Sequence, residues 1–141
     1  MDATQAHKFY EECLSTIYVR GQLEHLPDYY LPEVAMHPPI PGLPAGIVGM
    51  ELAVRGFLSS FSSLSLRMED FTAEGGDTYR CMVRVEATHS GEFMGLAATG
   101  RRVESVAEHR FRLHGNRIIE SWSRADLTRV HRELSASSQA A

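Results

Sequence analysis

Two neighbouring segments near the end of the chain bring ionisable residues close together. Residues 103–113 and 117–126 alternate apolar and polar side chains, and Gly115-Asn116 between them is a typical β-hairpin turn. Opposed residues of a hairpin share one face of the sheet. The expected pairs are Leu113 with Ile118, Phe111 with Glu120, His109 with Trp122, Ala107 with Arg124 and Ser105 with Asp126. An apolar face that carries a histidine, an arginine and carboxylates indicates a binding pocket.

His109 and Asp126 are the candidate proton-transfer residues of this face, with Arg124 between them. The ordinary pKa of histidine, about 6.5, suits general acid–base catalysis near neutral pH; the alternative is a half-buried histidine bonded to serine or backbone. An apolar pocket would raise the pKa of Asp126 unless Arg124 kept the carboxylate ionised. Alternatively, Asp126 is the N-cap of a helix over residues 127–134. A shift of register by one residue would place the side chains of the two strands on opposite faces of the sheet.

Other side chains are candidates for binding a substrate. Trp122 and Phe111 would shape the pocket, and Glu120 lies on the same predicted face. Tyr18 has a hydroxyl that suits a substrate carbonyl, although a helical tyrosine beside apolar residues also suits a core. Arg124 would stabilise a developing enolate or alkoxide.

Two histidines lie at the ends of predicted strands. His37 precedes the proline-rich segment 38–46, and a pocket role and a structural role are equally compatible with that position. His89 lies where a strand enters a glycine-rich loop, and pinning that loop is the favoured role over chemistry.

Hydrophobic periodicity divides the chain into a helical half and a sheet half. Apolar residues recur at helical spacing in 4–20, 23–30 and 49–64, and the period changes to two after Ser65. Gly75-Gly76 is the expected turn between strands 66–73 and 78–89. A short strand is expected at 34–37 and a frayed tail over 135–141. Helices followed by an antiparallel meander predict one α+β domain.

Composition narrows the classes of partner. The chain has 141 residues, 43% of them hydrophobic, and a net charge of −4 without a basic stripe, so nucleic acid is not expected as a partner. No membrane span or signal peptide is evident, and we expect a cytoplasmic protein. Cys13 and Cys81 are expected to be reduced thiols. The histidines show no metal-ligand spacing and no phosphate-binding loop is present, so neither a metal nor a cofactor is expected.

Two ordered motifs carry a family resemblance. Residues 88–103 read THSGEFMGLAATGRRV and residues 117–122 read RIIESW. The chain thereby resembles the SnoaL-like polyketide and ester cyclases over residues 5–134. The resemblance implies a cone-shaped fold of the nuclear transport factor two type. Three N-terminal helices would pack on a curved antiparallel sheet with a mixed edge and enclose a pocket. It also implies a homodimer.

The resemblance implies an intramolecular aldol closure that uses a carboxylate on the last strand, with histidines and a tyrosine nearby. Many members have Asp two residues after the tryptophan, where this chain has Arg124, so that only Asp126 could replace it. The related epoxide hydrolases have an Arg-x-Asp element that Arg84-Val85-Glu86 matches in part. A motif proline is replaced by Ala98, which we expect to be a tolerated loop change.

We therefore expect a cofactor-independent cyclase, isomerase or hydratase that acts on a hydrophobic, polyketide-like metabolite of secondary metabolism. The alternatives are a non-catalytic small-molecule-binding protein in which Arg124 holds an anionic or carbonyl group, and an epoxide hydrolase-like enzyme with an altered catalytic set.

Overall fold

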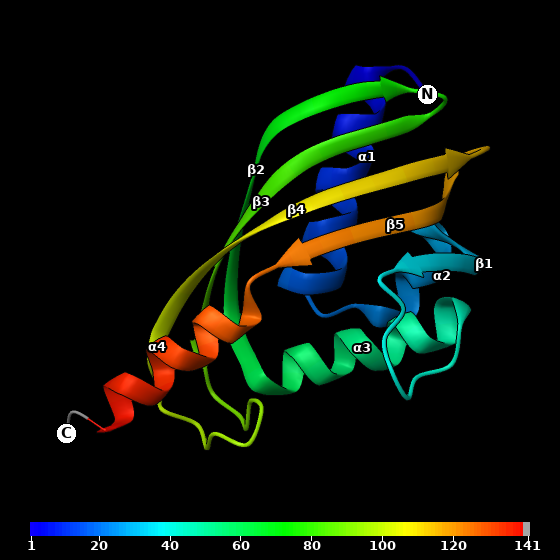
Figure 1. Ribbon diagram of the computed structural model, residues 1–141. Helices are drawn as coiled ribbons and strands as arrows, with labels where there is room; N and C mark the ends of the chain where they lie inside the picture. The colour runs from blue at the N-terminus through cyan, green and yellow to red at the C-terminus, as the bar shows by residue number, and fades with distance from the viewer. Residues whose placement is uncertain (140–141) are drawn as a thin grey trace.

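A five-stranded curved sheet forms the frame of the protein. The computed structural model describes the backbone of residues 1–139 and the side chains of residues 1–136. The strand order is β1-β5-β4-β3-β2, in which β1 and β5 are parallel and the other neighbours antiparallel. The sheet is strongly curved and therefore has a concave and a convex face (Figure 1). The strands are β1 (Tyr30–His37), β2 (Phe61–Gly75), β3 (Thr78–His89), β4 (Arg102–His114) and β5 (Arg117–Ala125).

Helices cover the concave face. Helix α1 (Ala3–Leu14) begins at Asp2, whose carboxylate accepts from the Gln5 backbone N–H at 2.8 Å, and continues as a π-helical segment, Ser15–Val19. A 3₁₀ turn (Leu23–His25) and α2 (Leu26–Tyr29) lead into β1. Helix α3 (Gly46–Ser60) packs on β1, and α4 (Leu127–Gln139) lies beside β4. The α+β class, the curved sheet and the parallel edge pair agree with the prediction; α4 adds a helix at the C-terminal end.

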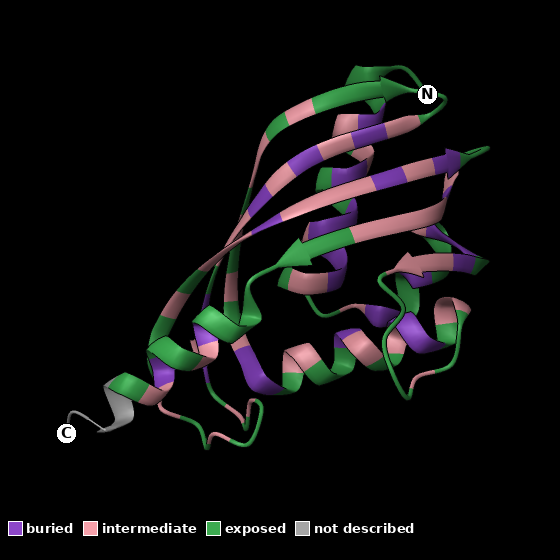
Figure 2. Cartoon of the chain, in the orientation of Figure 1, coloured by how far each residue is buried: buried purple, intermediate pink, exposed green. Residues whose placement is uncertain are grey.

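The apolar core lies between α1, α3 and the concave face. Buried and partly exposed residues alternate along β3 and β4 (Figure 2), as expected for strands with one covered face. Buried β3 and β4 residues of the main cluster are Tyr79, Cys81, Val83, Phe111 and Leu113. A second cluster joins Phe61, Ala87, Val130 and Leu134 near α4.

Several element boundaries differ from the prediction, and three of the differences affect how the elements pack. The helix expected over 49–64 ends at Ser60, and Phe61 already pairs with His89 in the sheet. The turn between β2 and β3 is formed by Gly76 and Asp77, with Gly75 opposite Thr78. Helix α4 continues to Gln139, into the tail that the sequence predicted to be frayed from residue 135; residues 140 and 141 lie outside the described part of the chain.

The predicted register of the β4–β5 hairpin is wrong beyond its first pair. Leu113 does face Ile118, but Arg112 faces Glu120, so Ile119 is an extra residue in β5. Such a bulge moves every later side chain of the strand to the opposite face. His109 consequently faces Ser123, and Trp122 faces Arg110.

Candidate functional site

A cavity of about 360 Å³ lies between the concave sheet face and the helices. Most of its wall is apolar, with contributions from α1, α3 and all five strands. Five exposed lining residues mark its mouth, between the loop after β1 and the start of α4: Pro38, Ile40, Ser123, Ala125 and Leu127. The volume and lining are typical of a site for a hydrophobic small molecule.

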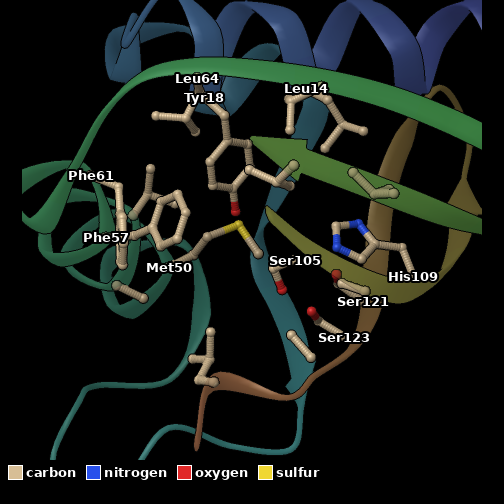
Figure 3. Close-up of a pocket in the computed structure, with 18 of the residues that line it drawn as sticks. Leu14, Tyr18, Met50, Phe57, Phe61, Leu64, Ser105, His109, Ser121 and Ser123 are labelled. Carbon is tan, nitrogen blue, oxygen red and sulfur yellow. The ribbon is translucent and has the colours of Figure 1, made fainter. Parts of the chain in front are cut away.

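The polar groups of the wall are uncharged or weakly basic. They are the hydroxyls of Tyr10, Tyr18, Tyr30, Ser105, Ser121 and Ser123 and the imidazoles of His37 and His109. No Asp, Glu, Lys or Arg lines the cavity among the described residues. Figure 3 shows the serine hydroxyls grouped near His109 on the sheet side, whereas Tyr18 enters from the helical side. The polar groups that can contact a ligand in this cavity are therefore hydroxyls and imidazoles.

His109 is held by a tyrosine of α1. Its Nδ1 lies 2.7 Å from the Tyr10 hydroxyl, and the Tyr10 ring stacks on Phe111 at 4.2 Å between centroids. Burial lowers the pKa of His109 to about 4, so the ring is neutral near pH 7. Nε2 has no hydrogen-bond partner among the described residues and, as part of a ring that lines the cavity, is available to a ligand. His109 thus lines the cavity, although it faces Ser123 instead of the predicted Trp122.

Tyr18 offers a second free polar group. Tyr10, Leu14 and Tyr18 are spaced four residues apart, and all three line the cavity. The Tyr18 hydroxyl has no hydrogen-bond partner among the described residues and points into the cavity in Figure 3. Burial raises the pKa of Tyr18 to about 12, so the hydroxyl stays protonated and is able to donate. The structure thus places Tyr18 at the pocket, as predicted.

His37 connects the cavity wall to the outer face of the sheet. It lines the cavity, its ring stacks on Trp122 at 5.1 Å, and its Nε2 lies 3.0 Å from Oε2 of Glu120. Arg112 binds the other oxygen of Glu120 at 2.6 Å and, together with His37, lowers the pKa of that carboxyl. The Glu120 carboxylate is thus engaged in an ion-paired network.

The prediction that the face of His109 also carries Trp122, Arg124 and Glu120 is wrong. The bulge at Ile119 turns them outward, where Trp122 lies 5.9 Å from the Arg110 guanidinium and Arg124 faces Glu108 across the strands. The inward positions fall instead to Ser121, Ser123 and Ala125. Phe111 shares the inner face with His109, but it is fully buried and supports Tyr10 rather than lining the cavity.

Asp126 caps α4. Its Oδ1 accepts from the backbone N–H of Arg129 at 3.0 Å, and its side chain is exposed outside the cavity wall. The structure thus adopts the helix-capping alternative for this residue. Asp126 therefore does not present its carboxylate to the cavity.

His89 pins the glycine-rich loop. It is fully buried, and its Nδ1 lies 3.0 Å from the Thr99 hydroxyl and accepts from the Thr99 backbone N–H at 3.2 Å. Gly91 in the same loop lies so close to Ser59 that an added Cβ would fall 1.9 Å from its carbonyl oxygen. His89 is absent from the cavity wall, so it is not placed there as the candidate substrate-binding residue, and its contacts are those of the loop-pinning alternative.

Sequence reasoning missed Tyr10 and the three serines. Tyr10 sits on an apolar helix face, where its pattern predicts a core residue, and its partner lies 99 residues away in the chain. The consecutive Ile118 and Ile119 were the available signal for the serines, because two adjacent apolar residues interrupt alternation and are compatible with a bulge.

The described residues contain no group of three or more His, Cys, Asp or Glu side chains placed to hold a metal ion. They also contain no helix that is long and apolar enough to cross a membrane.

Comparison with known proteins assigns the family. The model of the SnoaL-like polyketide cyclases matches residues 4–134, and the chain belongs to this family. The structure is similar to TsrD from Streptomyces laurentii, with a TM-score of 0.84, 29% identity, and coverage of 96% of this chain and 98% of TsrD. A search of curated proteins found no match.

Two more distant solved structures share the fold. A SnoaL-like polyketide cyclase from Agrobacterium tumefaciens has a TM-score of 0.73 at 19% identity, with coverage of 91% of this chain and 96% of that one. IdmH from Streptomyces antibioticus has a TM-score of 0.72 at 24% identity, with coverage of 91% and 94%. At these identities the likeness concerns the fold, and the reaction has to be argued from the cavity.

Proposed function

We propose that this protein is a cofactor-independent enzyme that cyclises, isomerises or hydrates a hydrophobic, polyketide-like metabolite. Membership of the SnoaL-like polyketide cyclases supports the substrate class. The observation that carries the proposal is His109, a neutral imidazole with a free Nε2 in a cavity whose wall is otherwise apolar or hydroxylic. A fixed polar group in a site of low dielectric stabilises developing charge more strongly than water does.

The chemistry is enolisation of a ligand carbonyl. A hydrogen bond from the site to the carbonyl oxygen stabilises the enolate that forms when an adjacent C–H bond breaks. In a ring closure the enolate carbon then attacks a second carbonyl of the same molecule, and the new alkoxide takes up one proton. The proton lost from carbon and the proton gained by oxygen balance, so closure needs no redox partner.

The hydroxyls near His109 would orient the ligand in the cavity. Ser121 and Ser123 lie on the same wall as His109, and Tyr18 offers a donor from the helical side (Figure 3). The apolar remainder of the wall favours a hydrophobic skeleton with oxygen atoms at these few positions. Because the bound ligand already holds its reacting groups close together, the reaction loses less entropy on reaching the transition state than it would in solution.

A non-catalytic binding protein is the second candidate. The observation in its favour is the absence of any carboxylate, lysine or arginine from the described cavity wall. Arg124, expected to hold an anionic group, faces Glu108 on the outer side. The geometry gives less support to an epoxide hydrolase, because Arg84 of the partial Arg-x-Asp match is bound by Glu69 and Glu104 outside the cavity.

Deuterium exchange of 2-tetralone tests the proposal. In D₂O the C–H groups beside its carbonyl exchange through the enolate, and NMR follows the rate. We expect the wild type to accelerate exchange above the buffer rate and His109→Gln to lower that acceleration by at least ~10²-fold. His25→Gln is the matched control, because His25 is exposed and pairs with Asp28 instead. Equal rates in wild type and His109→Gln would contradict the proposal; binding without exchange would favour the second candidate.

A further inference from the structure

Tyr10 determines how His109 faces the cavity. We infer that Tyr10 is a positioning residue whose hydroxyl donates to Nδ1 of His109 and thereby keeps the proton of the imidazole on Nε2, directed at the ligand. This inference rests on the proposed function and deepens it: His109 would act on the ligand as a hydrogen-bond donor rather than as a base.

The Tyr10 hydroxyl has a single hydrogen-bond partner among the described residues. Tyr10 is 2% exposed, and His109 Nδ1, at 2.7 Å, is the only hydrogen-bond partner of its hydroxyl among the described residues. If Nδ1 carried the proton and donated, the tyrosine O–H would have no acceptor among the described residues. Burying an unpaired donor is unfavourable, so the tyrosine O–H donates and Nδ1 accepts.

Tyr10 and His109 are both held in place by their packing. The Tyr10 ring stacks on Phe111, which is fully buried, and Phe111 and His109 both project inward from β4. The tyrosine hydroxyl and the imidazole are therefore held by the same strand and by helix α1. A hydrogen bond between two groups fixed in this way selects one tautomer, as a partner on one ring nitrogen does for other functional histidines.

The protonation states agree with this arrangement. Burial raises the pKa of Tyr10 well above its ordinary value, so its hydroxyl keeps the proton that it donates. Burial also lowers the pKa of His109 to about 4, so the ring carries a single proton near pH 7. With Nδ1 accepting, that proton is on Nε2.

The consequence concerns the ligand. A neutral N–H donor stabilises a carbonyl oxygen as it becomes an enolate oxygen, and a neutral imidazole is suited to this role because it enters the reaction without a charge to neutralise. The Nε2–H bond stays intact, and the proton released from carbon passes to solvent or to another oxygen of the ligand. A ligand therefore has to present an acceptor to His109.

Nitrogen-15 NMR of the ligand-free protein at pH 7.5 tests the inference. The His109 signals are those that His109→Gln removes, and their positions distinguish a protonated from an unprotonated ring nitrogen. We expect protonated Nε2 and unprotonated Nδ1 in the wild type. In Tyr10→Phe, which keeps the stacked ring and removes the hydroxyl, the ring should relax toward a mixture that includes Nδ1–H. A protonated Nδ1 in the wild type, or an unchanged tautomer in Tyr10→Phe, would overturn the inference.

Exchange kinetics provide the functional readout. Tyr10→Phe should lower the 2-tetralone exchange rate about tenfold, the effect of one lost positioning contact. Tyr79→Phe is the control: Tyr79 is buried in the same aromatic cluster, but its hydroxyl donates to the Met1 carbonyl and it lies outside the cavity wall. It should change the rate less than twofold. Equal losses in both variants would contradict a specific role for Tyr10.

The two measurements fail independently. Nitrogen protonation is read without any ligand, so a wild type that shows no exchange would contradict the proposed function, while the NMR result would still decide the inference. If a thermal melt showed that the Tyr10→Phe variant is not folded, the wild-type spectrum alone would decide the inference.

Discussion

His109 of β4 lies directly opposite Ser123 of β5, and both side chains line the cavity. The Ser123 hydroxyl is therefore the one best placed to share a ligand oxygen with the imidazole. We predict that Ser123→Ala weakens binding of 2-tetralone about two- to tenfold, the value of one hydrogen bond. NMR titration measures the affinity. Ser65→Ala on the exposed face of β2 should leave it unchanged, and an equal loss in both variants would refute the assignment.

Stability should depend on pH through His109. The pKa is about 4 in the folded protein and about 6.5 in the unfolded chain, so the unfolded state takes up the proton first as pH falls. The contribution to stability is fully present above pH 6.5 and decreases between pH 6.5 and 4. We predict a loss on the order of 2 to 3 kcal/mol from this group by pH 4.5. Urea unfolding at pH 7.5 and 4.5 should show a smaller decrease for His109→Gln than for the wild type; identical decreases would contradict the buried neutral imidazole.

Asp126 should act through helix stability rather than through catalysis. Its carboxylate caps α4, so Asp126→Ala should lower the free energy of unfolding by ~1 kcal/mol, whereas Asp126→Asn should largely restore it because Asn is also a good N-cap. Both variants should retain the 2-tetralone exchange rate at a temperature where they are folded. Loss of exchange in a folded Asp126→Asn variant would return this residue to the list of catalytic candidates.

We propose that the outer face of the sheet joins two copies of the chain. Arg80 faces Arg110, Met82 faces Glu108 and Arg84 faces Val106 there, a mixed polar surface that suits a hydrated interface. Light scattering at micromolar concentration should give about twice the 15.7 kDa chain mass. Val106→Arg should shift that value toward the monomer. A monomer mass for the wild type would contradict the proposal.

Local pattern was sufficient for most of the fold. The period of two and the Gly115-Asn116 turn predicted β3 and the closing turn of the last hairpin, because both depend on residues that are near in sequence. The helical spacing likewise predicted α1. The boundary of α3 was missed because Phe61 continues a helical apolar pattern, yet pairs with His89 across the sheet.

The site was harder to predict than the fold, because the inward face of β5 carries small polar residues and the large apolar Trp122 lies on the outer face. A regular hairpin register placed Trp122 inward; with the bulge, the inward positions hold the small residues Ser121, Ser123 and Ala125. The bulge at Ile119 that produces this arrangement breaks the strict alternation on which the predicted register rested. His109 keeps its inward position because alternation along β4 alone sets its face, whichever register β5 adopts.

A crystal structure with 2-tetralone bound is the most direct test of the central claim, that the cavity presents His109 to a ligand carbonyl. The account predicts the ketone oxygen within about 3.2 Å of His109 Nε2, with the ring system against the apolar wall formed by α1 and α3. A ketone oxygen bound at Tyr18 with His109 Nε2 unoccupied, or a ligand bound only outside the cavity, would contradict it.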